Sequence, residues 1–231
     1  MSSKQKMKPR FVTLEANFKD GPNPDSVTFN KETGILEFGN NGELLTPKTA
    51  NVEWAYARPK KEKPIRRYPV DEEKIQLHPD YSLMQADIIY VIDTNTDTKN
   101  KISVSCILQG TPRLDENGVK IGIHFKSLPY LVVKGNIESP EKAGWCQLIK
   151  REVNEPGVNI LIIVDAHLDE LESYNSGERP VFGEFYLPRN VNLMYASADV
   201  GKEHIVNKVM SQANKAATKM IKQILSGEVC V

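Results

Sequence analysis

The sequence predicts an α/β protein in which helices pack on a mixed β-sheet, and three observations support that prediction. The chain has 231 residues, 40% of them hydrophobic, so it can bury a core as one large or two small domains. Apolar runs typical of strands dominate the chain up to residue 133, and beyond residue 139 strands alternate with stretches of helical periodicity. Antiparallel strands followed by such alternation imply a mixed sheet with helices on its faces.

The first part of the chain is expected to form a small antiparallel β-module. Alternating apolar and polar residues between turn-forming Gly, Pro and Asn predict strands at 11–18, 26–29, 34–38 and 52–57. The stretch from Arg58 to Arg67 is basic, interrupted by proline and poor in apolar residues. It is interpreted as a linker, with a phosphate-contacting arm as the alternative. The predicted domains are therefore 1–79, the β-module with its linker, and 80–231.

The second domain is predicted from apolar periodicity and from residues that begin or end helices. Ser139 and Pro140 suit the N-cap and first turn of a helix, and apolar residues recur at helical spacing from there to Val153. A long amphipathic helix is predicted at 202–225. The expected strands are 88–92, 101–108, 119–125 with a continuation through 131–133, 158–164 and 190–196.

Composition narrows the functional classes. Lys plus Arg and Asp plus Glu each number 30, so the formal net charge of zero gives no global attraction to nucleic acid or membrane. Three cysteines without CxxC spacing argue against a disulfide framework and against a zinc site. The sequence has no secretory signal and no apolar run of the roughly 20 residues that cross a bilayer, so a cytoplasmic protein without a membrane partner is expected. P-loop, GxGxxG, HExxH and Gly-x-Ser-x-Gly motifs are absent.

Three of the apolar segments end on an aspartate, and these residues are the main candidates for a functional site. The segments that begin at Ile88, Val158 and Val191 run into Asp93, Asp165 and Asp199, respectively. The end of a strand holds a side chain rigidly at the rim of the sheet, so neighbouring strand ends would gather these carboxylates. Because carboxylate oxygens are the ligands of hard divalent cations, the pattern predicts a metal site that includes all three aspartates.

Residues 87–225 resemble the ribonuclease H-like superfamily in the order of their elements and in the positions of acidic residues. Asp93 matches the aspartate of the family's first strand, and Asp165 matches the aspartate that ends its fourth strand. Glu141 matches the glutamate that the first helix of the family often supplies. The resemblance implies a metal-dependent nuclease, in which Mg²⁺ or Mn²⁺ assists the hydrolysis of phosphodiester bonds in nucleic acid.

The last predicted helix departs from the family's pattern. It carries Asn214, within Ala213-Asn-Lys-Ala-Ala217, where the resemblance leads us to expect an aspartate. An asparagine oxygen is a neutral metal ligand, so Asp199 or Glu203 would have to supply the missing charge. If neither does, the resemblance implies a degenerate relative that binds nucleic acid without cleaving it.

Each candidate carboxylate also has a structural interpretation. Asp93 opens a polar stretch whose side chains suit a hairpin turn. Asp165 and Asp199 each precede a stretch that they could cap as a helix. Glu141 lies where an acidic side chain interacts favourably with the helix dipole.

Other residues near the predicted strand ends add weaker hypotheses. His167 and His204 are candidates for a proton shuttle or a metal ligand, with exposed polar residues as the alternative. The last helix has lysines that suit a phosphate backbone or a solvated face, namely Lys202, Lys208, Lys215, Lys219 and Lys222. The alternative to a nuclease is a non-catalytic module for protein interaction or assembly, and a third hypothesis is a hydrolase of a small phosphorylated ligand.

Overall fold

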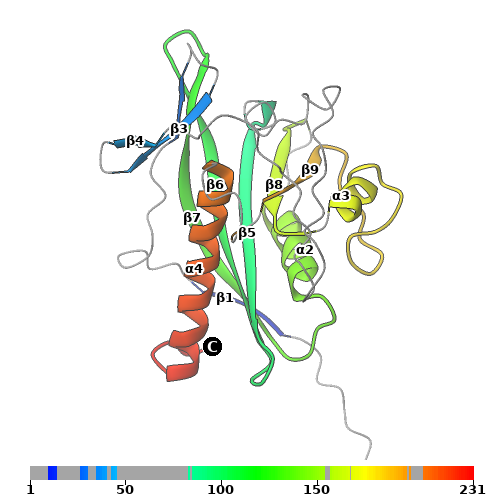
Figure 1. Ribbon diagram of the computed structural model, residues 1–231. Coiled ribbons are helices and arrows are strands. Elements are labelled where there is room, and N and C mark those ends of the chain that lie inside the picture. Colours follow the sequence, from blue (N-terminus) through cyan, green and yellow to red (C-terminus); the bar gives the residue numbers. More distant parts are fainter. Residues whose placement is uncertain are drawn as a thin grey trace, which may run out of the picture.

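The described part of the chain is an α/β structure built on one mixed sheet. The computed structural model describes residues 10–14, 27–30, 35–40, 43–45, 83, 85–153, 157–166, 168–196, 198 and 205–231. Five strands carry the helices, and they are β5 (Ile88–Asp97), β6 (Ile102–Leu114), β7 (Lys120–Lys134), β8 (Ile160–Val164) and β9 (Val191–Tyr195). Their order across the sheet is β7-β6-β5-β8-β9, as Figure 1 shows. The predicted α/β fold with a mixed sheet is confirmed.

The strand directions follow the connections between strands. β5, β6 and β7 are joined by hairpins and pair antiparallel, whereas β8 and β9 are reached through helices and run parallel to β5. Parallel neighbours need such a crossover because a tight hairpin can only reverse the chain. β5 therefore has an antiparallel neighbour on one side and a parallel neighbour on the other.

The strands described in the first part of the chain extend the same sheet. They are β1 (Arg10–Leu14), β2 (Val27–Asn30), β3 (Ile35–Asn40) and β4 (Glu43–Leu45). β1 and β2 both pair antiparallel with β7, and β3 and β4 follow β2 outward. The predicted strand 52–57 and the basic stretch from Arg58 to Arg67 lie outside the described residues. The domain boundary between residues 79 and 80 stays a prediction.

In the described part of the chain, three helices of eight or more residues cover the two faces of the five central strands. α4 (Ile205–Ser226) packs on one face, and α2 (Pro140–Glu152) packs on the other. α3 (Leu168–Asn175) joins the α2 side between β8 and β9, where the sequence predicted only a short helix as one interpretation of Asp165. In Figure 1, α4 lies in front of β6 and β7, and α2 and α3 lie toward the side of β8 and β9.

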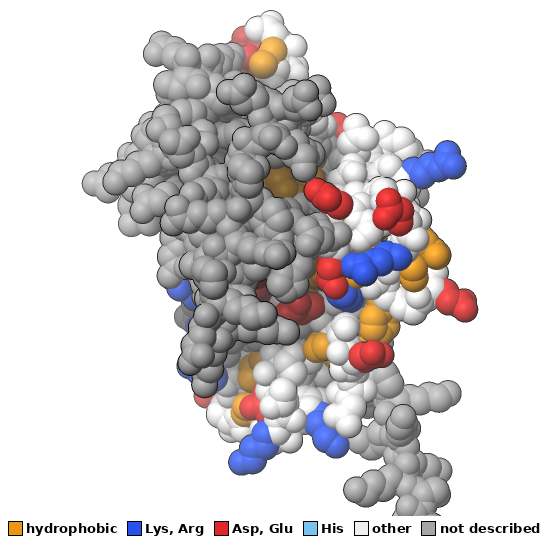
Figure 2. Space-filling model, turned by 45° about the vertical axis from the view of Figure 1, so that its right-hand side comes forward, with side chains coloured by type: hydrophobic (Ala, Val, Ile, Leu, Met, Phe, Trp, Pro, Cys, Tyr) orange, Lys and Arg blue, Asp and Glu red, His pale blue; other side chains and the backbone are white. Residues whose placement is uncertain are grey.

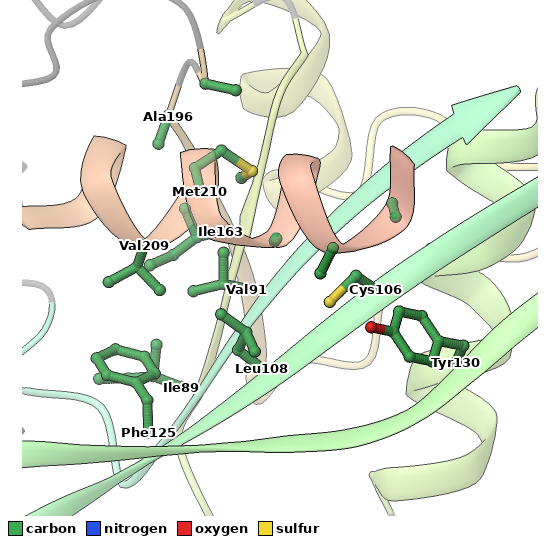
Figure 3. Close-up of a cluster of buried hydrophobic side chains, with 14 of the residues drawn as sticks. Ile89, Val91, Cys106, Leu108, Phe125, Tyr130, Ile163, Ala196, Val209 and Met210 are labelled. Carbon is green, nitrogen blue, oxygen red and sulfur yellow. The ribbon is translucent and has the colours of Figure 1, made fainter. Parts of the chain in front are cut away.

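Alternation along β5 divides the interior into two cores. Ile89 and Val91 belong to the core under α4, and Tyr90 and Ile92 belong to the core under α2. All four side chains are at most 1% exposed, so β5 is covered on both faces. Figure 3 shows the α4 side, where Val91 lies near Met210 of the helix. Apolar burial on both faces is the main stabilising contribution to this arrangement.

The polar end of β5 is part of the strand, which corrects the predicted end of that strand at residue 92 and the turn expected in the polar stretch after it. The Thr94 and Ser105 hydroxyls form a hydrogen bond of 2.7 Å across β5 and β6, and Thr96 and Ser103 form another of 3.0 Å. These cross-strand pairs satisfy polar side chains that sequence patterning assigns to a loop. The reversal occurs after Asp97, whose carboxylate accepts a hydrogen bond from the backbone N–H of Asn100.

A β-bulge in β7 lies opposite Cys106. Ser105 pairs with Leu131 and Ile107 pairs with Leu128, so Pro129 and Tyr130 together oppose one residue. Proline has no N–H to donate to a ladder, which explains an irregularity at that point in a central strand. Figure 3 shows the Tyr130 ring beside Cys106 in the core under α4.

The side chain of Asn175, at the end of α3, forms hydrogen bonds with the backbone at the outer edge of β9. Its amide nitrogen donates to the Leu193 carbonyl at 2.9 Å, and its amide oxygen accepts from the Leu193 N–H at 2.8 Å. The Val191 N–H donates to the Pro188 carbonyl at 3.0 Å. The amide of Asn175 thus provides the same donor and acceptor as one residue of a neighbouring strand.

Gly144 permits α2 to approach the polar pair on β5 and β6. A methyl group at residue 144 would lie 2.7 Å from the Ser105 Oγ and 3.4 Å from the Thr94 Oγ1. Gly144→Ala is therefore expected to lower the free energy of unfolding by about 1–3 kcal/mol, because α2 has to shift. Urea denaturation measures this loss, and Ser105→Ala added to Gly144→Ala should recover part of it. An unchanged denaturation midpoint for Gly144→Ala would contradict the close packing.

The three thiols are expected to differ sharply in reactivity. Cys106 and Cys146 are buried and Cys230 is exposed. Burial raises the pKa of the Cys106 thiol, with a smaller contribution from the charge of Asp93, and burial raises the pKa of Cys146 from 9.0 to about 12. Native protein should present one fast thiol to Ellman's reagent, and Cys230→Ser should remove that phase.

The same pKa shift predicts a loss of stability at high pH. The unfolded thiol of Cys146 ionises near its ordinary pKa of 9.0, whereas the folded thiol keeps its proton up to about 12. Its contribution is complete below the lower value and is lost as the pH rises through this interval. Denaturation midpoints measured across the interval check this, and the pH dependence should weaken in Cys146→Ala. A second fast thiol in the native protein would contradict the burial on which both expectations depend.

Candidate functional site at the carboxyl ends of β5 and β8

Asp93 is the buried carboxylate of the described structure, and β5 positions it. The residue follows Ile89 and Val91 on the face of the sheet that α4 covers, and only 8% of it is exposed. Across the sheet it pairs with Cys106, whose pKa its charge helps to raise. A carboxylate in such surroundings is unfavourable unless hydrogen bonds or other charges compensate for its lost hydration. The structural interpretation of Asp93 as a turn residue is therefore wrong, since it lies inside the strand.

Asp165 directly follows the neighbouring parallel strand β8, at the position that corresponds to Asp93 when the strand register is continued. The last pair between β5 and β8 joins Val91 to Ile163, and each aspartate comes two residues after its member of that pair. Adjacent strands are separated by about 4.8 Å. Ile163 belongs to the core under α4, so alternation directs Asp165 to the same face as Asp93. Asp165 is partly buried.

Asn95 connects Asp93 to α4, and sequence analysis did not single it out. Its side-chain amide nitrogen lies 3.4 Å from the Asp93 Oδ2, 3.1 Å from the Asn214 carbonyl oxygen and 3.0 Å from the Thr218 Oγ1. One amide group therefore contacts the carboxylate and two successive turns of the helix. Residues two apart on a strand share a face, but the strand predicted from the sequence ends at residue 92, so the spacing of Asn95 from Asp93 gave no signal.

Asn214, the neutral ligand predicted on the last helix, is connected to Asp93 through Asn95. It is partly buried on α4, and its backbone carbonyl accepts the hydrogen bond from Asn95. The structure thus connects Asp93 and the backbone of Asn214 through Asn95, at the end of the sheet where Asp165 follows β8. Whether the Asn214 side chain binds a metal stays a prediction.

The other sequence candidates are not joined to this group by the described structure. Glu141 is exposed in the first turn of α2, which packs on the opposite face of the sheet. Asp199, Glu203, His167 and His204 have no described position or side chain. Their proposed roles therefore stay predictions.

The donor set of the site is suited to a hard cation but is incomplete among the described residues. Within that part of the chain, no group of three or more His, Cys, Asp or Glu side chains is arranged to hold a metal ion. Asp93 and Asp165 supply carboxylate oxygens, and Asn214 carries a side-chain amide oxygen. Such ligands match the preference of Mg²⁺ for oxygen. The site would need further ligands, such as the predicted Asp199, to hold two cations.

The surface around α2 and α3 carries both signs of charge. Figure 2 shows acidic and basic side chains interspersed over the described residues of that view. Glu170 pairs with Lys142 at 3.1 Å and with Arg179 at 3.6 Å, and both cations lie over the Tyr174 ring. This cluster joins α2 to α3 and to the chain after α3. Its charges are thus engaged in holding these elements together.

Comparisons with known proteins leave the argument to the geometry. No protein-family model, no curated protein and no solved structure matches the chain. Among the described residues, none of the helices has both the length and the apolar character required to span a bilayer.

Removal of the Asn95 amide is expected to loosen α4 from the sheet. Asn95→Ala deletes the contacts with Asp93, Asn214 and Thr218, so the free energy of unfolding should fall by about 1–3 kcal/mol. Urea denaturation provides the measurement. The matched control is Asn192→Ala on the exposed side of β9, which should change stability by less than about 0.5 kcal/mol. Equal effects of the two variants would argue against the role assigned to Asn95.

Proposed function

We propose that residues 87–225 form a ribonuclease H-like domain and that Asp93 and Asp165 are the central ligands of a divalent-cation site. The proposed activity is metal-dependent hydrolysis of phosphodiester bonds in DNA or RNA. In the chain, the three antiparallel strands β5, β6 and β7 are followed by β8 and β9, which run parallel to β5. This strand order supports the relationship. The proposal therefore makes the protein a nuclease whose cations are Mg²⁺ or Mn²⁺.

The observation that carries the proposal is the placement of two carboxylates at equivalent positions on neighbouring parallel strands. Asp93 and Asp165 each follow the Val91–Ile163 pair by two residues and share the face under α4. Two anionic groups at adjacent strand ends repel each other, and a divalent cation between them relieves that repulsion. Active sites of open α/β sheets also form outside the carboxyl ends of parallel strands.

The residues of the site would bind and orient the reacting groups. A bound divalent cation lowers the pKa of water and stabilises negative charge on phosphate oxygens. Asp93 would accept a hydrogen bond from the amide of Asn95, which would link its carboxylate to α4. Asp165 would approach from the next strand. Asp199, four residues after the end of β9, would supply the third carboxylate, and Asn214 would contribute a neutral oxygen.

A nucleic-acid-binding relative without catalytic activity is the second candidate. The observation that favours it is that two neutral residues, Asn95 and Asn214, lie near Asp93 where a further acid would strengthen cation binding; the Asn95 amide contacts Asp93 and the backbone carbonyl of Asn214. Neutral amides bind phosphate and base edges but attract a divalent cation only weakly. A protein-interaction or assembly module remains the outcome that a failure of both candidates would favour.

A cleavage assay tests the proposal. Labelled single-stranded and double-stranded DNA and RNA are incubated with the protein and Mg²⁺, Mn²⁺ or EDTA. We expect cleavage with either metal, and Asp93→Asn or Asp165→Asn should reduce the rate by at least about 100-fold, since each variant removes a charged ligand. The matched control is Glu116→Gln, which removes one exposed negative charge in the turn between β6 and β7 and should retain full activity.

Thermal unfolding with and without Mn²⁺ separates the candidates. Mn²⁺ should raise the melting temperature of the wild type and leave an Asp93→Asn, Asp165→Asn double variant unchanged, because ligands of the native state stabilise it. If Mn²⁺ has no effect and no substrate is cleaved, the metal site does not exist. Salt-sensitive binding of nucleic acid in that case would support the non-catalytic relative.

A further inference from the structure

The outward side of α4 is positively charged, although the chain as a whole has no net charge. The helix spans Ile205–Ser226 and contains four lysines and no aspartate or glutamate. Lys208 is partly buried, and Lys215, Lys219 and Lys222 are exposed. The formal net charge of the whole chain is zero, so this helix departs locally from the balance of the sequence.

The four lysines form one stripe because of their spacing. They are separated by seven, four and three residues, which are the separations that return to the same side of an α-helix. At 1.5 Å per residue the stripe from Lys208 to Lys222 is about 21 Å long. One strand of duplex DNA places a phosphate about every 3.4 Å along its axis, so a stripe of this length spans about six phosphates.

α4 has a second polar surface between the lysine stripe and the sheet. We name Ser211, Asn214 and Thr218 the polar flank; they are partly buried and follow one another at helical spacing. Asn95 contacts the Asn214 carbonyl and the Thr218 hydroxyl, so the polar flank is the part of α4 that faces Asp93. The lysine stripe therefore lies next to the candidate carboxylate site, on the same helix.

We propose that the lysine stripe of α4 binds the sugar–phosphate backbone of nucleic acid and that the polar flank directs the bound strand toward Asp93. The direction toward Asp93 rests on the proposed function, whereas the binding itself needs neither metal nor cleavage. Lysine is a phosphate ligand through its charge, and hydroxyl and amide groups donate hydrogen bonds to phosphate oxygens.

The chemistry of the helix favours nucleic acid over a membrane or a protein partner. An amphipathic helix that binds a membrane inserts its apolar side, but the apolar side of α4 is buried against the sheet, with Val209, Met210 and Ala213 at most 1% exposed. The centre of a protein interface is normally apolar and depleted in lysine. Among the described side chains of α4, Leu225 near the end of the helix is an exposed large apolar residue, which is not enough for such a centre, whereas a phosphate backbone requires only positive charge along a line.

The test compares two pairs of lysine substitutions that remove equal charge. Lys215→Gln with Lys222→Gln neutralises two exposed positions of the stripe, and glutamine retains helix propensity. The control is Lys99→Gln with Lys126→Gln, both exposed; Lys99 lies in the β5–β6 turn, and Lys126 lies on the sheet face opposite α4, since its neighbour Phe125 is in the core under α4. Melting temperatures establish that both pairs are folded.

Fluorescence anisotropy of labelled single-stranded and duplex DNA is measured in EDTA between about 50 and 200 mM salt. The stripe pair should weaken binding about tenfold and reduce the slope of log affinity against log salt by about 2, because each lysine neutralises about one phosphate. The control pair should change the slope by much less. Equal effects of the two pairs, or no binding by the wild type, would overturn the inference.

Two further outcomes separate this inference from the nuclease proposal and from a membrane partner. Binding that depends on the lysine stripe, without cleavage in Mg²⁺ or Mn²⁺, would support this inference. It would contradict only the proposed nuclease activity. Phosphatidylserine vesicles are the competing probe. Vesicle binding with the same lysine dependence, in a protein that does not bind DNA, would replace the nucleic-acid assignment by a membrane surface.

Discussion

The two-residue alternation of β5 is the constraint on which the rest of the structure depends. β5 pairs with β6 along its length and with β8 over its first part, and its two faces supply both hydrophobic cores. A shift of its register by one residue would exchange Val91 with Tyr90 or Ile92 and would turn Asp93 toward α2. The positions of α2, α4 and the candidate site therefore follow from one strand.

The same alternation explains why the candidate site lies where it does. On the α4 face, β5 changes from Ile89 and Val91 to Asp93 and Asn95, at the point where β8 ceases to pair with it. The apolar contacts of the first part of the strand fix the backbone, and the polar part extends from that support. Precise placement of a carboxylate requires such a rigid base, because hydrogen bonds alone would leave it several orientations.

Much of the fold followed from the sequence, because apolar periodicity records burial directly. The continuous apolar run before Asp165 predicted a strand at 158–164, and all five residues of β8 are buried. The spacing of apolar residues in α4 likewise predicted the side that packs on the sheet. These predictions depend on side chains whose only favourable surroundings are apolar.

Polar residues inside regular structure were harder to predict, and the candidate site consists of them. Thr94, Asn95 and Thr96 have the composition of a turn, yet they belong to β5 because Ser103, Ser105 and α4 provide their partners. These partners come from distant parts of the chain, so no local pattern reveals them. Asp93 was therefore predictable because it follows an apolar stretch, whereas Asn95 was not, because its role exists only once α4 is in place.

The amide of Asn175 has a consequence for how copies of this protein can meet. A sheet that ends in an open strand invites another molecule to continue its ladder, which is a common route to fibrils and to exchanged strands. At Leu193 both backbone groups are already engaged by Asn175, and the Val191 N–H is engaged by Pro188. An incoming strand would first have to displace α3 from the edge of β9, so self-association along this border is disfavoured by the fold itself.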